Sequence, residues 1–327
     1  MNILFFGSTQ DSVIVCDALF NHSQQLQMTL KAVVTQPAKP IGRKQIITPT
    51  PVEVWAKTHA ITCLTFKTQK DTPWKYEDEG KVTETLSTES PDLFVSASYG
   101  QKIPEELITK AKHGGINVHP SLLPHWRGTD PIPWTILAGD AQTGVSIVTL
   151  SNKFDEGKIL AQQKIPVPHK GTPEEIRAHL FTLGATLLTD ILPDYLAGKH
   201  IGNTQNETHA TYARRLSKDD GFIPWDIIVD AMNGKTVTEH AYTGILSATK
   251  TSLPEAIFRA VRALSPWPGV WSVVPVDKEV TKRLKILEVR VQGEKLVIDS
   301  VQLEGKKPTP FAAFTDAYGR TLDNTKT

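Results

Sequence analysis

Residues 115–128 read GINVHPSLLPHWRG, and the rest of the chain can be understood around this stretch. It begins with a short apolar run, 116–119, and a β-strand there would turn Asn117 and His119 to the same face. Pro120 ends the hydrogen bonding of the strand, and the proline and glycine that follow predict a loop. Because open α/β sheets bind ligands at their strand ends, this polar pair marks a candidate site.

An amide beside an imidazole suits acyl transfer through a tetrahedral intermediate. The amide can donate a hydrogen bond to an oxygen that gains negative charge, and the imidazole can donate or carry a proton. Asp155 lies in a turn-like Asp-x-Gly, where its carboxylate could orient His119 or take a proton from an attacking amine. A capped turn with two satisfied structural polar residues is the alternative, and spacing alone does not exclude it.

Strand-like and helix-like segments alternate along the first half of the chain. Apolar runs at 3–6 and 30–35 flank a helical pattern at 11–21, which predicts a β-α-β unit. The turn after the first strand lacks the G-x-G-x-x-G spacing, so a nicotinamide cofactor is disfavoured, and Ser8 or Asp11 is the expected helix cap. The same reasoning predicts helices at 52–59, 104–112, 129–138 and 172–196, and strands at 61–66, 93–98, 144–150 and 159–167.

The order of the motifs resembles that of the folate-dependent formyltransferase family. NVHPSLLPHWRG is followed by PIPWTIL, GVSIV and FDEGKIL. The resemblance implies an α/β fold with a Rossmann-like, mostly parallel sheet and a catalytic centre of Asn117, His119 and Asp155. It also implies a folate pocket shaped by the S-L-L-P segment and the Tyr-Gly turn, although core packing is the alternative for the tyrosine. The residues so assigned to folate are Tyr99, Gly100, Ser121, Leu122, Leu123 and Pro124.

Residues 36–51 contain four prolines and one glycine, and predict a long loop rather than a regular element. Lys39, Arg43 and Lys44 lie in it without a neighbouring acid, which also fits a solvated basic loop. The T-Q-P-x-x-P-x-G-R segment resembles methionyl-tRNA formyltransferases, in which this inserted loop reaches toward the acceptor end of the tRNA. The resemblance implies that Arg43 and Lys44 contact tRNA.

A second domain is expected after a polar linker. Short apolar runs separated by charged or glycine turns follow this linker, as in a small β-barrel. We therefore expect a catalytic domain at 1–205 and a C-terminal domain at 206–327. The segments TYARRLSKDDGFIPWD and IFRAVRALSPWPGVW resemble the same family, where an OB-like barrel helps hold tRNA. Lys218 and Arg262 are the candidate RNA contacts there.

Composition is that of an ordinary globular protein. The chain has 327 residues, of which 39% are hydrophobic and 22% charged, and a formal net charge of +1. Any RNA contact must therefore come from local patches. We expect no signal peptide, no membrane span and no metal site. The isolated Cys16 and Cys63 fit free thiols in a reducing compartment, so the cytoplasm is the expected location.

The resemblance implies a reaction as well as a fold. A formyl group would pass from 10-formyltetrahydrofolate to the α-amine of methionine on initiator tRNA, for translation initiation. Asn117 and His119 would stabilise the oxyanion, His119 would pass a proton to the leaving folate nitrogen, and Asp155 would orient His119 and accept the amine's proton. We expect a monomer. Formylation of a nucleotide-linked amino sugar, and RNA binding without catalysis, are the open alternatives.

Overall fold

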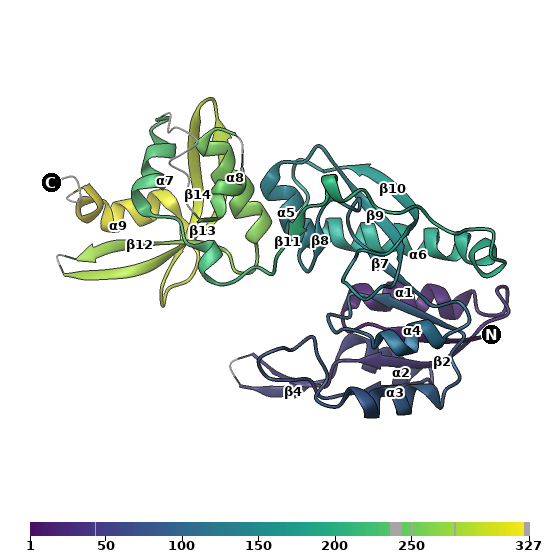
Figure 1. Ribbon diagram of the computed structural model, residues 1–327. Helices are drawn as coiled ribbons and strands as arrows, with labels where there is room; N and C mark the ends of the chain where they lie inside the picture. The colour runs from purple at the N-terminus through teal and green to yellow at the C-terminus, as the bar shows by residue number, and fades with distance from the viewer. Residues whose placement is uncertain (43, 236–243, 250, 278, 324–327) are drawn as a thin grey trace. The chain divides into compact units, whose positions relative to one another are not determined.

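The structure is a computed structural model that describes the chain except residues 43, 236–243, 250, 278 and 324–327 (Figure 1). The chain divides into two compact units. Residues 206–213 cluster with unit 1, and the division into domains at 1–205 and 206–327 stays a prediction. Unit 1 comprises Met1–Pro131, Gln142–Pro166 and Glu174–Ala213, and unit 2 comprises Ile132–Ala141, Val167–Pro173 and Arg214–Thr327.

Unit 1 is built on a seven-stranded sheet with the order β10-β9-β7-β6-β1-β2-β5. The strands from β7 to β5 run parallel, whereas β9 is antiparallel to both of its neighbours. The expected Rossmann-like, mostly parallel sheet is therefore confirmed. The strands are β1 (Asn2–Phe6), β2 (Thr29–Thr35), β5 (Thr62–Thr65), β6 (Leu93–Ala97), β7 (Gly115–His119), β9 (Gln142–Thr149) and β10 (Ile159–Pro166).

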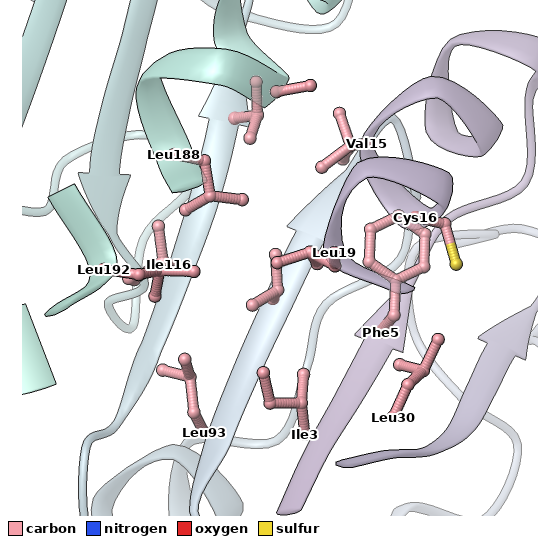
Figure 2. Close-up of a cluster of buried hydrophobic side chains, with 14 of the residues drawn as sticks. Ile3, Phe5, Val15, Cys16, Leu19, Leu30, Leu93, Ile116, Leu188 and Leu192 are labelled. Atoms are coloured by element: carbon pink, nitrogen blue, oxygen red, sulfur yellow. The ribbon is translucent and has the colours of Figure 1, made fainter. Parts of the chain in front are cut away.

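Helices cover both faces of this sheet. Figure 2 shows one of the two cores, in which Val15 and Leu19 of α1 and Leu188 of α6 pack with Ile3 and Ile116 of the sheet. Helix α2 joins the same core, and α3 and α4 cover the opposite face. Strands between two helical layers have to be apolar on both faces, which explains the uninterrupted hydrophobic runs of β1 and β6. The helices are α1 (Gln10–Asn21), α2 (Pro51–Thr58), α3 (Glu79–Ser87), α4 (Glu105–Lys110) and α6 (Pro173–Leu196).

The first helix is capped by Thr9, so the expected cap at Ser8 or Asp11 is wrong. The Thr9 hydroxyl accepts a hydrogen bond from the backbone N–H of Ser12, and the Ser12 hydroxyl accepts one from the backbone N–H of Thr9. This reciprocal capping box satisfies two backbone donors. Ser8 has a different role, because its hydroxyl accepts a hydrogen bond from the backbone of Gln36.

The proline-rich stretch 36–51 contains a hairpin, so the prediction of an irregular loop is wrong. Strands β3 (Lys39–Ile41) and β4 (Ile46–Thr48) pair antiparallel, with Pro40 opposite Ile47. A two-stranded ribbon consists only of edge strands, so a proline there interrupts no hydrogen bonds to a third strand. Arg43, the expected tRNA contact in this stretch, lies outside the described residues.

Unit 2 contains a four-stranded antiparallel sheet in the order β12-β13-β14-β15. Helix α8 packs against β13 and β14, and its buried residues include Ile257, Ala260 and Leu264. A second, β-rich part after the mostly parallel sheet is therefore confirmed. Its elements include α7 (Trp225–Met232), α8 (Leu253–Leu264), β12 (Val270–Asp277), β13 (Val280–Gln292), β14 (Lys295–Leu303), β15 (Thr309–Pro310) and α9 (Phe311–Asp323), together with most of α5 (Pro131–Ala138).

Candidate active site

Asn117 and His119 lie in the second half of β7 and meet Asp155 from the turn between β9 and β10. The side-chain nitrogen of Asn117 donates to Asp155 Oδ1 at 3.2 Å, and His119 Nδ1 lies 3.4 Å from the same oxygen. His119 is buried, and its Nε2 lies 2.9 Å from the carbonyl oxygen of Trp126. The structure thus brings together the three residues that the sequence nominated for catalysis.

Strand pairing explains why these side chains converge. In the ladder between β7 and β9, His119 is opposite Ser146 and Asn117 is opposite Val148. Asn117 and His119 share one face of β7 because they are two residues apart, whereas Val118 between them belongs to the core on the other face. The turn after β9 then returns the carboxylate of Asp155 to that polar face.

Both ring nitrogens of His119 face oxygen acceptors, which are the carbonyl of Trp126 and the carboxylate of Asp155. A neutral imidazole donates a hydrogen bond at one nitrogen only, whereas an imidazolium donates at both. The two acceptors therefore hold the ring from both of its nitrogens. The Asp155 carboxylate in turn fixes the orientation of that ring.

The carboxylate of Asp155 is held on both oxygens. Oδ2 accepts a hydrogen bond from the backbone N–H of Gly128 at 2.9 Å, and Oδ1 is shared by Asn117 and His119. The backbone of Asp155 has φ +58°, a left-handed conformation that costs a non-glycine residue on the order of 1–3 kcal/mol. Such strain persists only where the surrounding structure fixes it, and it concentrates at functional sites.

Two glycines let the backbone close around Asp155. Gly128 has φ +107°, and a Cβ at this position would lie 2.7 Å from the carbonyl oxygen of Ala213. A Cβ at Gly157 would lie 1.7 Å from the carbonyl oxygen of Thr149. The glycine of the Asp-x-Gly motif is therefore required because the turn approaches the end of β9 too closely for any side chain.

A buried arginine close to the Asp155 turn was not identified from the sequence. Arg127 is fully buried, and its Nε donates to Gln205 Oε1 at 3.0 Å. Its two terminal nitrogens donate to the two carboxylate oxygens of Glu207 at 2.9 and 2.7 Å. Gln205 Nε2 donates to the carbonyls of Asp155 at 2.6 Å and Gly157 at 2.8 Å. The hydrogen bonds between Arg127 and Glu207 lower the pKa of Glu207 and raise that of Arg127.

The Tyr-Gly turn assigned to folate follows β6, the strand next to β7. The phenol of Tyr99 is buried with its OH 2.8 Å from that of Tyr76, and burial raises the pKa of Tyr99 well above its usual range. Its carbonyl accepts a hydrogen bond from Gln36 Nε2 at 2.9 Å. Gly100 follows with φ +78°. The Tyr99 side chain therefore packs in the core, and any contribution of this turn to a ligand site comes from its backbone.

The S-L-L-P segment is fixed by the hydroxyl of Ser146. This hydroxyl accepts a hydrogen bond from the backbone N–H of Leu123 at 3.1 Å and donates to the carbonyl of Ser121 at 2.6 Å. Ser121 and Leu123 are buried, and Leu122 and Pro124 are half-buried. The segment thus has a defined shape beside the catalytic strand, and its contact with folate stays a prediction.

The candidate RNA contacts have different surroundings. Lys44 is exposed in the β3–β4 turn, near Ile41 and Ile46, which are 60% and 62% exposed. In unit 2, Lys218 is exposed, and its carbonyl accepts a hydrogen bond from the indole of Trp271 at 3.1 Å.

Arg262 on α8 is half-buried and is bound to the protein's own backbone. Its guanidinium donates to the carbonyls of Gly171, at 2.7 Å, and Pro168. Burial lowers the pKa of Arg262 from its ordinary value. Its role in RNA binding stays a prediction, and the structure gives it a role in joining α8 to the 167–173 segment of the same unit.

The described residues include no group of three or more His, Cys, Asp and Glu side chains that could hold a metal ion. No helix in the described part of the chain is both long and apolar enough to cross a membrane. Cys16 and Cys63 are free thiols, the first buried and the second half-buried.

A family model described as formyl transferase matches residues 1–192, more than half of the chain. The chain belongs to the formyl transferase family. Curated relatives named methionyl-tRNA formyltransferase include that of Listeria innocua, 32% identical over 342 residues and covering 99% of this chain and 97% of the relative. That of Enterococcus faecalis is 31% identical over 340 residues, with 98% and 97% covered. The resemblance drawn from the motifs is therefore confirmed, and the protein is a formyl-transferring enzyme.

Solved structures with a similar fold are also named as formyltransferases. A sugar N-formyltransferase from Shewanella sp. FDAARGOS_354 has a TM-score of 0.55 at 19% identity, over 89% of this chain and 99% of that one. A 4-N formyltransferase from Francisella tularensis has a TM-score of 0.57 at 17% identity, over 85% and 93%. WlaRD, a sugar 3N-formyl transferase studied with dTDP and 5-N-formyl-THF, has a TM-score of 0.56 at 14% identity, over 94% and 99%. At these identities the likeness shows the fold alone.

Proposed function

We propose that the protein transfers the formyl group of 10-formyltetrahydrofolate to the α-amino group of methionine on initiator tRNA. The product would be N-formylmethionyl-tRNA for translation initiation in the cytoplasm. The observation that carries the proposal is the convergence of Asn117 and His119 on one oxygen of Asp155. The choice of methionyl-tRNA as the acceptor is supported by the similarity, over nearly the whole chain, to relatives named methionyl-tRNA formyltransferase.

In the proposed reaction the neutral amine attacks the formyl carbon, and the formyl oxygen gains negative charge. The Asn117 amide carries two hydrogens, so one can bind Asp155 while the other is directed to that oxygen. In this proposal His119 exchanges the contact of its Nε2 with the Trp126 carbonyl for the substrate, stabilises the same oxygen, and passes a proton to the folate nitrogen as the bond of that nitrogen to carbon breaks. Asp155 accepts the proton that the attacking amine loses.

We place the folate donor over the ends of β6 and β7, between the Tyr99-Gly100 turn and the S-L-L-P segment. Strand ends of open α/β sheets are the usual ligand sites. Gln101 supports this placement, because it is 5% exposed and its side-chain oxygen has no hydrogen-bond partner among the described residues. A buried amide oxygen normally accepts a hydrogen bond, and the pterin ring of a folate offers several N–H groups.

We propose that tRNA is held by exposed cations and aromatic side chains rather than by a strongly charged face. Lys44 with the exposed isoleucines of the β3–β4 hairpin is one such surface. In unit 2, Arg283 lies 4.2 Å from the ring centroid of Trp271, which also packs against the 40% exposed Phe222 near Lys218. Stacking platforms flanked by cations are typical of surfaces that bind nucleic acid.

The test supplies 10-formyltetrahydrofolate carrying a radiolabelled formyl group to the purified protein. Charged initiator tRNA and a nucleotide-linked amino sugar are offered in parallel. We expect label in the methionyl-tRNA alone. Label in the sugar with none in the tRNA would replace this acceptor by the amino sugar, and folate binding with no labelled product would reject catalysis.

A further inference from the structure

Residues 205–213 are hydrogen-bonded to the loop that follows β7 and contacts the active site. Strand β11 (Tyr212–Ala213) runs parallel to β8 (Arg127–Gly128), and both are labelled in Figure 1. The backbone N–H of Trp126 donates to the Thr211 hydroxyl at 2.8 Å, and that of Arg127 donates to the Thr211 carbonyl at 2.9 Å. This segment therefore holds the loop whose Gly128 N–H binds the Asp155 carboxylate.

Gln205 connects this segment directly to the strained turn. Its Nε2 donates to the carbonyls of Asp155 and Gly157, so one amide group holds both carbonyls that flank Glu156. The arrangement allows one orientation of the amide only, because two carbonyls require a donor and the Arg127 N–H requires an acceptor. Gln205 is 6% exposed, so water does not readily replace these contacts.

Arg127 holds Gln205 and is itself held by several further groups. Its charge is balanced by the two oxygens of Glu207, with Glu156 Oε1 3.6 Å away and the Tyr212 hydroxyl accepting at 3.2 Å. A guanidinium presents its donors in a rigid planar fork, so its contacts with Glu207 set the direction in which Nε meets Gln205. Arg127 and Glu207, which lie outside the catalytic cluster, thus help to set the orientation of the Gln205 amide.

We propose that Gln205, oriented by Arg127, is a positioning residue that keeps Asp155 in its left-handed conformation and its carboxylate on Asn117 and His119. This inference rests on the proposed function, because its kinetic test assays the proposed formyl transfer. Without the Gln205 donor, two buried carbonyls lose their partner and the backbone of Asp155 relaxes toward a commoner conformation. Among the described residues of unit 1, the hydrogen bonds of the Gln205 side chain go to Arg127, Asp155 and Gly157 and not to the turns proposed for folate, so substrate binding should be preserved.

The test replaces Gln205 by Glu, which keeps the size and the acceptor for Arg127 but removes the donor. We expect kcat to fall about tenfold to a hundredfold, with both KM values within about twofold of wild type, as when catalytic groups are misplaced. Gln69→Glu is the matched control, because Gln69 Nε2 donates to the carbonyl of Tyr76 at 3.2 Å in a different part of unit 1. This control should keep its kcat. Gln205→Asn, whose amide is one methylene shorter, serves if Gln205→Glu does not fold.

A double-mutant cycle with Asp155→Asn separates positioning from a general structural effect. If Gln205 acts through Asp155, then Gln205→Glu should add no further loss of kcat in the Asp155→Asn background. Losses that multiply across the two sites would overturn the proposal. A wild-type protein that fails to formylate methionyl-tRNA would instead reject the proposed function alone.

Hydrogen exchange provides a readout that needs no turnover. The backbone N–H of Gly128 donates to the Asp155 carboxylate, so its protection reports the position of that group. We expect faster exchange at Gly128 in Gln205→Glu and unchanged exchange in Gln69→Glu. Wild-type protection of Gly128 in folded Gln205→Glu would overturn the positioning role whatever acceptor the enzyme uses.

Discussion

The Asp155 site and the β3–β4 hairpin belong to the same unit but are held in opposite ways. Around Asp155, side chains and backbone groups that are tens of residues apart in sequence share hydrogen bonds, and Arg127 among them is fully buried. The hairpin is two strands of three residues, paired with each other, and it exposes Ile41, Ile46 and Ile47 by 60% or more. The first region holds its side chains in fixed positions, and the hairpin exposes apolar side chains to solvent.

The difference follows from what each region is proposed to do. Formyl transfer requires hydrogen-bond donors whose positions relative to the developing charge are accurate to a few tenths of an ångström. The catalytic groups therefore need support from several segments. Contact with a large polyanion requires reach and charge rather than exact placement. Substitutions at the site should therefore lower kcat, whereas substitutions in the hairpin should raise the KM for tRNA.

Asp155→Asn should give the largest effect and the sharpest contrast. The amide cannot accept the proton of the attacking amine and no longer orients the His119 ring as the carboxylate does, so kcat should fall about 10³-fold to 10⁴-fold, as when an orienting carboxylate is lost elsewhere. Steady-state formylation with both substrates saturating measures it. Asp71→Asn makes the same charge change at an exposed position of unit 1 and should behave as wild type. A loss below tenfold in Asp155→Asn would remove Asp155 from the mechanism.

Arg127→Lys should affect both stability and turnover. A lysine keeps the charge but cannot bind Gln205 and Glu207 together. We expect kcat to fall about tenfold through misplaced catalytic groups, and the free energy of unfolding in urea to fall by about 2 kcal/mol through the buried hydrogen bond that is lost. Arg177→Lys is the control, because Arg177 makes one long contact with Asp11, at 3.8 Å. Unchanged turnover and stability in Arg127→Lys would show that the network is dispensable.

Lys44→Ala in the hairpin should act on binding alone. We expect the KM for tRNA to rise about threefold to tenfold at low salt, with kcat unchanged, and the difference to shrink as salt screens the phosphates. Lys31→Ala, at an exposed position of β2, should leave the KM as it is. A drop in kcat without a change in KM would contradict the division of labour between hairpin and site.

The pH dependence of stability should show the contribution of the Arg127–Glu207 pair near the Asp155 site, and this effect should be smaller. Arg127 lowers the pKa of Glu207, so the unfolded chain binds more protons near the ordinary value of 4.5. The stabilisation is complete above pH 4.5 and is lost as the pH falls further, through the folded pKa. Urea unfolding of Glu207→Gln should show a flatter dependence below pH 4.5. Glu84→Gln, at an exposed position, should keep the wild-type slope, and an unchanged slope in Glu207→Gln would refute the pairing.

Local patterns predicted most of the elements that position the site. The apolar runs of the parallel strands and the two-residue spacing of Asn117 and His119 follow from alternation along a strand. The hairpin was not foreseen because its prolines argue against strands, and that rule has less force in a two-stranded ribbon. Helix α3 was not predicted, because its amphipathic signal rests on the buried Val82 and Leu86 alone.

The supporting network could not be predicted in the same way. Arg127 is 78 residues from Gln205 and 80 from Glu207. Arginine is usually exposed, and no local sequence pattern indicates which distant acceptors a buried arginine will bind. The W-R-G motif was recognised as part of a resemblance, but the burial of its arginine depends on how β8 and β11 pair. Asp155 was proposed from its turn-like Asp-x-Gly, and the order of the family's motifs supported that choice.

Single-turnover formyl transfer by Asn117→Ala tests the central claim most directly. Saturating 10-formyltetrahydrofolate and methionyl-tRNA isolate the chemical step, and Asn21→Ala on α1 is the control, since its exposed amide donates to the Asp17 carboxylate of the same helix. We predict a fall of about 10²-fold to 10³-fold in the transfer rate, as for a lost oxyanion donor, with folate affinity unchanged. A transfer rate close to wild type in folded Asn117→Ala would contradict the assignment of this site to catalysis.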